Sequence, residues 1–347
     1  MERLRINGTT IPPGTRATLE LPVARLYTHA DLVLPVKVIN GTKPGPVLFV
    51  TAAIHGDEIN GVEIIRRLLG QLRAEELRGA LIAVPVVNVH GFLQRSRYLP
   101  DRRDLNRSFP GSGRGSLAAR VAHRVMQSIV ARATHGIDLH TAATHRVNLP
   151  QIRADLAHEP TRRLAEGFGA PLVLNTDVPD GSLRQAAMDK GLPVLLFEGG
   201  EGMRLDEGAI AVGLRGVLRV MGLLDMLASA VPTGAPVIAL ASSWVRAQGS
   251  GMFLPAVQVG TVVEKGAPLG VIAHPFDDLE VQLQTPFDAV VIGLSRMPLV
   301  HEGEALIHLA RVDDAATAAA RMAQFLAPCK DKNSTQRRRD TENAEEK

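Results

Sequence analysis

Strand-like and helix-like segments alternate along the first two thirds of the chain. Unbroken apolar runs, typical of strands buried on both faces, cover residues 47–54, 80–87 and 192–197. After the first of them, apolar residues recur at helical spacing over residues 60–72. Further strands are predicted at 32–40, 136–141 and 172–175, and further helices at 117–133, 161–169, 182–190 and 205–228. This alternation predicts an α/β fold with a mixed, mostly parallel sheet that helices cover on both faces.

The pattern changes near Val231. From 235 to 309, short strand-like runs are separated by Gly, Pro and Asp turns, and the two halves of this part resemble each other. This part resembles the barrel-sandwich module of biotinyl and lipoyl carriers, but Phe276–Glu280 stands where a carrier has its modifiable lysine. We therefore expect a small all-β structural or lid module. The predicted division is 1–230 for the α/β domain, 231–310 for the β module, and 311–347 for a helix and a disordered charged tail.

Composition narrows the class of protein. Of 347 residues 45% are hydrophobic but only 3% aromatic, so Val, Leu, Ile and Ala must fill the core. The net charge of +3 comes from mixed charges without a basic stripe, which argues against a nucleic-acid partner. The single cysteine, Cys329, excludes an intrachain disulfide and a cysteine-based zinc site. The sequence has neither a signal-peptide pattern nor a membrane-span pattern, so we expect a cytoplasmic protein without a membrane partner.

Polar residues appear abruptly where several predicted strands end. His55 and Glu58 follow the first buried strand and precede a helix, and open α/β sheets bind ligands at that edge. Two histidines, a glutamate and a water form a known catalytic zinc set, so this pair needs one more ligand. His140 and Glu198 end two other strands. Each of these residues alone also fits a purely structural role. Glu201, three residues further along, is the alternative to Glu198 as the functional carboxylate at this strand end.

Four motifs in order carry a family resemblance. They are His55–Glu58, Arg97 with Asp104–Phe109, Asp138–Thr141, and Phe197–Gly199. Over about residues 30–230 the chain resembles the succinylglutamate desuccinylase/aspartoacylase family, which belongs with the zinc carboxypeptidases, and the β module matches that family's C-terminal domain.

The resemblance implies a role for each matching residue. His55, Glu58 and His140 would hold one Zn²⁺ per chain, and Glu198 would be the general base. Asn106 and Arg107 would bind a substrate carboxylate, and Arg97 would polarise the scissile carbonyl. The link between Tyr98 and Asp104 is longer here than in the family's pattern, so Arg102 and Arg103 remain alternatives to Arg97.

The chemistry of these residues fits amide hydrolysis. A zinc-bound water, a carboxylate base and an arginine facing the developing oxyanion are the parts that this reaction needs. We therefore expect a zinc-dependent deacylase that acts on a small N-acyl compound with a carboxylate, and a homo-oligomer is possible. The alternatives are a metallocarboxypeptidase that acts on a peptide C-terminus and a non-catalytic zinc-binding protein. Asp138 is expected to orient a ligand from behind.

Overall fold

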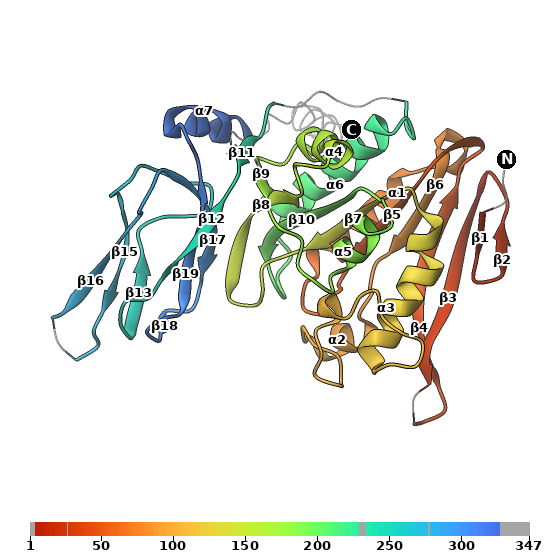
Figure 1. Ribbon diagram of the computed structural model, residues 1–347, viewed down its shortest axis with the longest axis horizontal. Coiled ribbons are helices and arrows are strands. Elements are labelled where there is room, and N and C mark those ends of the chain that lie inside the picture. Colours follow the sequence, from red (N-terminus) through yellow and green to blue (C-terminus); the bar gives the residue numbers. More distant parts are fainter. Residues whose placement is uncertain (1–3, 26, 229–233, 277, 327–347) are drawn as a thin grey trace, which may run out of the picture.

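The computed structural model describes residues 4–25, 27–228, 234–276 and 278–326. Cys329 and the tail predicted at 330–347 lie outside these residues. Over the described residues, thirteen strands form one mixed sheet (Figure 1). Its main path runs β12 (Ser242–Arg246), β19 (Ala305–Arg311), β17 (Ala289–Ser295), β8 (Arg146–Ala154), β10 (Val194–Glu201), β7 (His135–His140), β5 (Lys43–Ala52), β6 (Arg78–Val84), β4 (Asp31–Asn40) and β3 (Thr15–Arg25). The predicted mixed sheet is confirmed, but the whole sheet is not mostly parallel, because five of its described strand pairs are parallel and seven are antiparallel. Most of the antiparallel pairs lie towards its two ends, where β3 and β4 and the C-terminal strands join it.

Shorter strands complete the architecture. Off the main path, β9 (Leu172–Asn175) pairs with β8 and with β11 (Val237–Ala239), and β14 (Val262–Val263) pairs with β17. A separate sheet has the order β16 (Glu280–Gln284), β15 (Pro268–Ala273), β13 (Gly251–Pro255), β18 (Leu299–Val300). At the N-terminal end, β1 (Leu4–Ile6) and β2 (Thr9–Ile11) form a hairpin.

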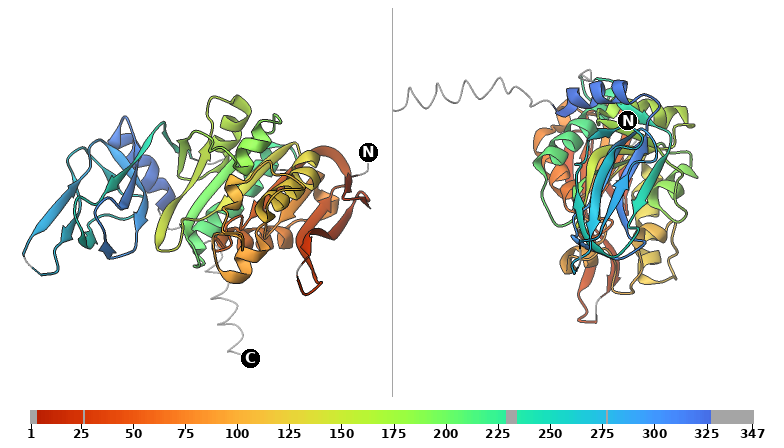
Figure 2. Two further views of the ribbon diagram at one scale, coloured as in Figure 1. Left: turned by 60° about the horizontal axis from the view of Figure 1, so that its bottom comes forward. Right: turned by 90° about the vertical axis from the view of Figure 1, so that its left-hand side faces the viewer.

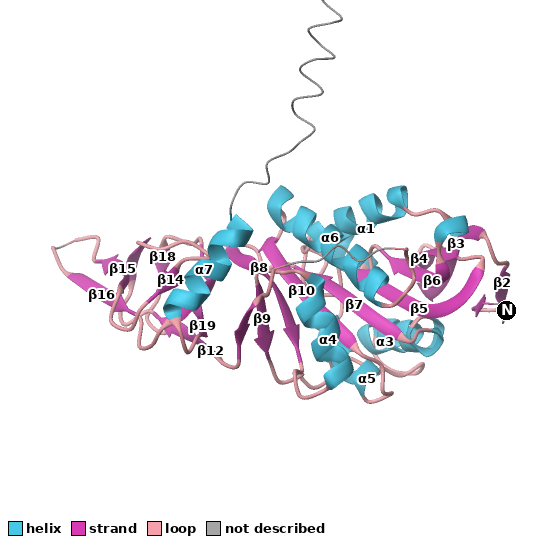
Figure 3. Cartoon of the chain, turned by 90° about the horizontal axis from the view of Figure 1, so that it is seen from above, coloured by secondary structure: helices cyan, strands magenta, loops and turns pink. Residues whose placement is uncertain are grey.

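Helices cover both faces of the α/β part, as predicted. The chain forms α1 (Asn60–Gln71), α2 (Val89–Gln94), α3 (Leu117–Ser128), α4 (Glu159–Phe168), α5 (Leu183–Met188), α6 (Glu207–Leu223) and α7 (Ala315–Leu326), with short 3₁₀ turns η1 (Ala74–Glu76), η2 (Leu105–Arg107) and η3 (Val130–Arg132). Figure 3 shows α1 and α6 on one side of the central strands and α3 and α5 on the other. The buried residues of α1, α4 and α6 form one apolar core, and those of α3 and α5 form another with the N-terminal hairpin. Among the described helices, none combines the length and the hydropathy that a bilayer crossing requires.

The central strands β6, β5, β7 and β10 are parallel. Parallel strands end at the same edge of a sheet, so residues that follow β5 meet those at the ends of β7 and β10. The register supports this directly, because Ala52 pairs with Leu139 and His140 pairs with Glu198. The topology therefore brings three distant segments of the chain to one edge.

The C-terminal strands form a sandwich that shares a sheet with the α/β part. Strands β17, β19 and β12 extend the main sheet beyond β8 through antiparallel pairs. The separate sheet packs against them over an apolar core that includes Phe253, Leu283 and Leu306 (Figures 1 and 2). Continuation of the main sheet into these strands was not predicted, nor were β8 and α2. Strand β8 (RVNLPQIRA) carries a proline and lacks clean alternation, so its sequence resembles a loop.

Candidate active site

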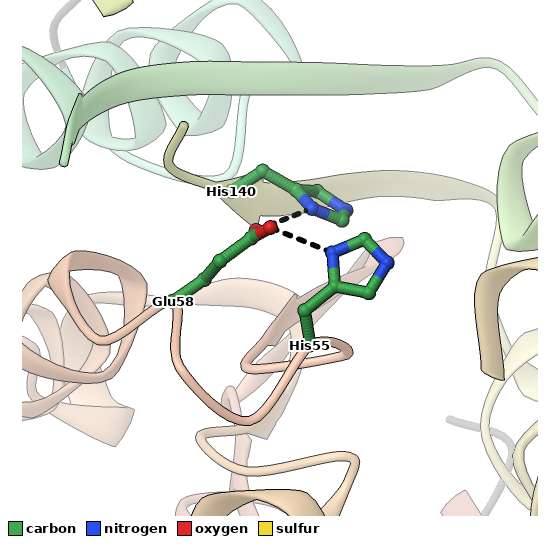
Figure 4. Close-up of side chains that lie close together, drawn as sticks. All are labelled: His55, Glu58 and His140. Atoms are coloured by element: carbon green, nitrogen blue, oxygen red, sulfur yellow. Dashed lines mark hydrogen bonds and ion pairs between the residues drawn. The ribbon is translucent and has the colours of Figure 1, made fainter. Parts of the chain in front are cut away.

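His55, Glu58 and His140 converge on one point at the strand-end edge (Figure 4). Glu58 lies between the two rings, with Oε1 2.7 Å from His55 Nδ1 and Oε2 2.7 Å from His140 Nδ1. One donor atom from each residue lies within 4.8 Å of the others, and all three residues are buried. The loop between β5 and α1 supplies the first two, and the end of β7 supplies the third.

The second nitrogen of each ring meets a further carboxylate. His55 Nε2 lies 3.1 Å from Asp104 Oδ1, and His140 Nε2 lies 2.8 Å from Asp138 Oδ2. Asp138 is itself held by the Thr51 hydroxyl, which donates to Oδ1 at 2.7 Å. Carboxylates behind ligand histidines fix the ring orientation and make the inner nitrogen more basic. Asp138 lies behind His140 as expected, whereas the contact of Asp104 with His55 was not anticipated.

The charges within this cluster balance one another. Burial opposes charging of His55 and of His140, but the adjacent carboxylates prevail and raise both pKa values. Burial likewise opposes ionisation of Glu58, yet the two rings hold its pKa well below the usual range. A cation at this point would displace the protons of the inner ring nitrogens, and the Glu58 carboxylate would then interact with the cation in place of the charged rings. Two imidazole nitrogens and a carboxylate, buried and fixed from behind, fit a divalent transition metal.

Asp138 should control metal affinity without touching the metal. We expect Asp138→Asn to weaken metal binding by about 10- to 100-fold, because an amide no longer supports the basicity of the His140 ring. Titration of the metal-free protein with Zn²⁺ against a competing chelator measures this change. Asp189→Asn, an exposed change at the C-terminal end of α5, serves as the matched control. Equal affinities for the two variants would contradict the predicted role.

Glu198 lines the same cavity as the three converging residues. Asn148 Nδ2 donates to its Oε2, and Arg153 Nη1 lies 3.5 Å from its Oε1. The cavity has a volume of about 370 Å³ and lies at the edge where the central strands end. Glu201 is absent from its lining and forms an ion pair with Arg204 at 3.3 Å.

The structure distinguishes the three candidate arginines of the long loop. Arg97 lines the cavity, donates from Nη2 to Asp104 Oδ2 at 2.8 Å, and places Nη1 3.6 Å from Glu58 Oε1. Arg102 and Arg103 are exposed and do not line the cavity. Arg97 is therefore the arginine of this loop that lies beside the cluster.

Asn106 and Arg107 also line the cavity, from η2. The Asn106 side chain is buried, and its Oδ1 accepts a hydrogen bond from Leu183 N at 2.9 Å, so it also holds the start of α5. Arg107 is exposed, and its Nη1 donates to the carbonyl of Asn106 at 2.7 Å. Among the described residues it has no carboxylate partner.

The C-terminal strands and β8 add a wall to the cavity, and the sequence analysis did not identify the residues of this wall. Trp244 on β12 lines the cavity, stacked on His308 with ring centroids 4.4 Å apart and an interplanar angle of 7°. The Arg146 guanidinium lies 5.1 Å from the centroid of the Trp244 ring, a cation–π contact. Trp244 is the only tryptophan of the chain, and this rarity was the one feature of the sequence that could have pointed to its place in the cavity.

His308 should make the fold sensitive to acid. Burial lowers its pKa to about 3, with Arg153 and Arg146 adding to the effect. The unfolded chain binds this proton near pH 6.5 whereas the folded one does not, so stability is full above that pH and falls as the pH decreases towards about 3. Between pH 7 and 4.5 we expect the free energy of unfolding to fall by about 2 to 3 kcal/mol more than in His308→Phe. Urea unfolding of both proteins at the two pH values measures this difference, and identical losses would contradict it.

Comparisons with known proteins show which family and which fold this chain resembles. The family model described as the succinylglutamate desuccinylase/aspartoacylase catalytic domain matches residues 44–224. The N-alpha-acetyl-L-2,4-diaminobutyric acid deacetylase of Halomonas elongata is 28% identical over 273 residues, which cover 75% of this chain and 79% of that protein. A succinylglutamate desuccinylase/aspartoacylase structure from Rhodobacter sphaeroides superposes with a TM-score of 0.76 at 26% identity, covering 85% of this chain and 95% of that one.

A further structure supports the fold alone. The product-bound ectoine utilization protein EutE (DoeB) of Ruegeria pomeroyi has a TM-score of 0.78 at 23% identity, covering 87% of this chain and 97% of that one. The resemblance inferred from the four motifs is thus confirmed by a match that spans just over half of the sequence. The chain belongs to the succinylglutamate desuccinylase/aspartoacylase family and is a hydrolase that acts on linear amide bonds.

Proposed function

We propose that this chain is a zinc-dependent deacylase that hydrolyses the amide bond of a small N-acyl amino acid. The observation that carries the proposal is the convergence of three buried metal-type donors with a separate carboxylate, Glu198, in one cavity. His55, Glu58 and His140 are the proposed metal ligands. Glu198 lies outside this cluster, so its carboxylate is the proposed group that accepts and donates a proton.

Zinc bound there would supply Lewis acidity and lower the pKa of a coordinated water. The protein's own part in the reaction is then proton transfer. Glu198 takes a proton from the attacking water as the oxygen adds to the acyl carbon, and delivers it to the nitrogen as the C–N bond breaks. The products are the free carboxylate of the acyl group and the free amine. Arg97, whose Nη1 lies 3.6 Å from Glu58 Oε1, is the proposed donor to the oxygen that becomes negative during the addition.

The charge of the cavity fits a substrate with a carboxylate. Five arginines but only three carboxylates line it. Arg107 is the proposed anchor, because its planar guanidinium matches a carboxylate with two parallel hydrogen bonds. Asn106 Nδ2 donates to no acceptor among the described residues, and it is the proposed second donor to the substrate carboxylate.

The size of the cavity favours a small substrate over a polypeptide. Its volume of about 370 Å³ lies in the range of small-molecule sites, and Trp244 borders it from the C-terminal strands. A metallocarboxypeptidase would use the same metal ligands and the same base, so the comparison of substrates must decide between the two activities. Nickel, cobalt and iron accept the same donor set, and zinc is proposed because two histidines and a carboxylate are one of its catalytic sets.

Metal analysis combined with an amine-release screen tests the proposal. Protein purified without chelators should contain about one zinc per chain and release amine from at least one N-acyl amino acid. The panel includes Nα-acetyl-2,4-diaminobutyrate, N-succinylglutamate and N-acetylaspartate, with short peptides as the competing class. Release from peptides alone would replace the deacylase by a carboxypeptidase. Protein that resists reconstitution with every divalent metal would overturn the ligand assignment.

A further inference from the structure

A single line of paired residues crosses five strands and runs from the C-terminal module to β10, the strand that carries the candidate base. Trp244 pairs with His308, His308 with Gly293, Gly293 with Asn148, and Asn148 with Gly200. Residues directly opposite each other in neighbouring strands face the same side of a sheet. Trp244 and Asn148 both line the cavity, so this line lies on the cavity side of the sheet.

Two positions of this line, Gly293 and Gly200, carry no side chain, and Gly293 is the one that lies between His308 and Asn148. A Cβ there would lie 2.9 Å from Asn148 Oδ1, 3.1 Å from His308 Cβ and 3.7 Å from Trp244 Cη2. The first of these distances is too short for an undisturbed contact. Glycine on β17 therefore leaves the space that the Asn148 amide occupies.

Asn148 spans the gap between the C-terminal strands and Glu198. Its Nδ2 donates to Glu198 Oε2, although Glu198 pairs in the sheet with Gln151 and not with Asn148. The contact exists because the register shifts between Glu198 and Gly200, a β-bulge of the kind that redirects side chains beside active sites. With Arg153 Nη1 3.5 Å from Oε1, both oxygens of the Glu198 carboxylate have a neighbour on β8.

We propose that Asn148 is a positioning residue for Glu198, and that Gly293 of the C-terminal module keeps open the space that Asn148 needs. The C-terminal strands thereby contribute to catalysis and not only to substrate binding. This inference rests on the proposed role of Glu198 as the base. An amide is suited to the task because it donates a hydrogen bond to the carboxylate without adding a charge that would weaken it as a base.

Steady-state kinetics of Asn148→Ala on the best N-acyl substrate of the panel provide the first test. A hydrogen bond to a charged group typically contributes enough to change a rate about tenfold or more, so kcat should fall by about that factor. KM should change little and the zinc content should stay at that of the parent protein. Thermal unfolding shows whether the variant is folded. A folded variant with unchanged kcat overturns the proposal.

Asn148→Asp gives a readout that a purely structural role would not move. A second carboxylate beside Glu198 favours the protonated base, so the acid limb of the kcat/KM profile should shift to higher pH. A profile superimposable on that of the parent protein would contradict contact between the two side chains in the working enzyme.

Gly293→Ala tests the contribution of the C-terminal strand, with Gly249→Ala as the matched control. A Cβ at Gly249 meets nothing within 4 Å, so the control should retain full activity. Gly293→Ala should lower kcat when it is introduced into the parent protein. It should lower kcat much less when it is introduced into Asn148→Ala, because that variant has no amide for the new methyl group to displace. Fully additive losses would show that Gly293 does not act through Asn148.

The same experiments separate this inference from the proposed function. If Glu198→Gln is inactive while Asn148→Ala keeps its full kcat, the base stands and the positioning role fails. If Glu198→Gln remains active, the base assignment itself fails and the inference fails with it.

Discussion

Glu198→Gln should lower kcat by about 10²- to 10⁴-fold, the usual contribution of a general base. Glutamine has nearly the same shape, but its neutral amide cannot take a proton from the attacking water. The carboxylate lies outside the His55–Glu58–His140 cluster, so the variant should still contain about one zinc per chain. Stopped assays of amine release and elemental analysis of the same sample measure both quantities.

Glu201→Gln is the matched control for this variant. Glu201 lies on the same strand, three residues further along, but pairs with Arg204 and does not line the cavity. Its replacement should leave kcat within about twofold of the parent value, because the Glu201 side chain lies outside the cavity. If activity survives in Glu198→Gln and disappears in Glu201→Gln, the two assignments must be exchanged.

His140→Ala should abolish metal retention together with activity. The change removes one of three ligands and takes the imidazole away from Oδ2 of Asp138, which is 1% exposed and keeps only the Thr51 hydroxyl on Oδ1. We expect a loss of zinc affinity well beyond the roughly 10- to 100-fold predicted for Asp138→Asn, which keeps all three ligands. Zinc content after dialysis, followed by amine release with and without added Zn²⁺, measures the effect.

His301→Ala controls for the general effect of losing a histidine. His301 is exposed, lies beside β18 and is not part of the cavity, so its replacement should leave zinc content and turnover unchanged. Full zinc occupancy in His140→Ala would remove His140 from the proposed ligands. Circular dichroism on each variant shows that the fold is retained.

Much of this protein follows from local sequence patterns. Buried strands without alternation, each ending in polar residues, are enough to predict that His55, Glu58, His140 and Glu198 lie at strand ends. Parallel strands end at a common edge, so these residues meet although 82 positions separate Glu58 from His140. The four motifs carried the family resemblance through their residue types and their order, and one of them lies in the long loop and not at a strand end.

Other features depend on contacts that no local pattern records. Asp104 reaches His55 because the long loop folds back over the β5–α1 turn, and the same fold brings Arg97, not Arg102 or Arg103, to the cavity. Asn148 lies on β8, whose sequence resembles a loop, and it meets Glu198 through a bulge in the pairing with β10.

The sequence by itself determined the α/β class, the strand-end residues and the family, since each depends on short-range periodicity and on residue types. Only the tertiary structure decided that the main sheet continues into the C-terminal strands and that Trp244, Gly293 and Asn148 share one line across it. Register between strands distant in sequence is set by the packing of whole faces, and a shift of one residue would turn the side chains of Trp244 and Asn148 away from the cavity.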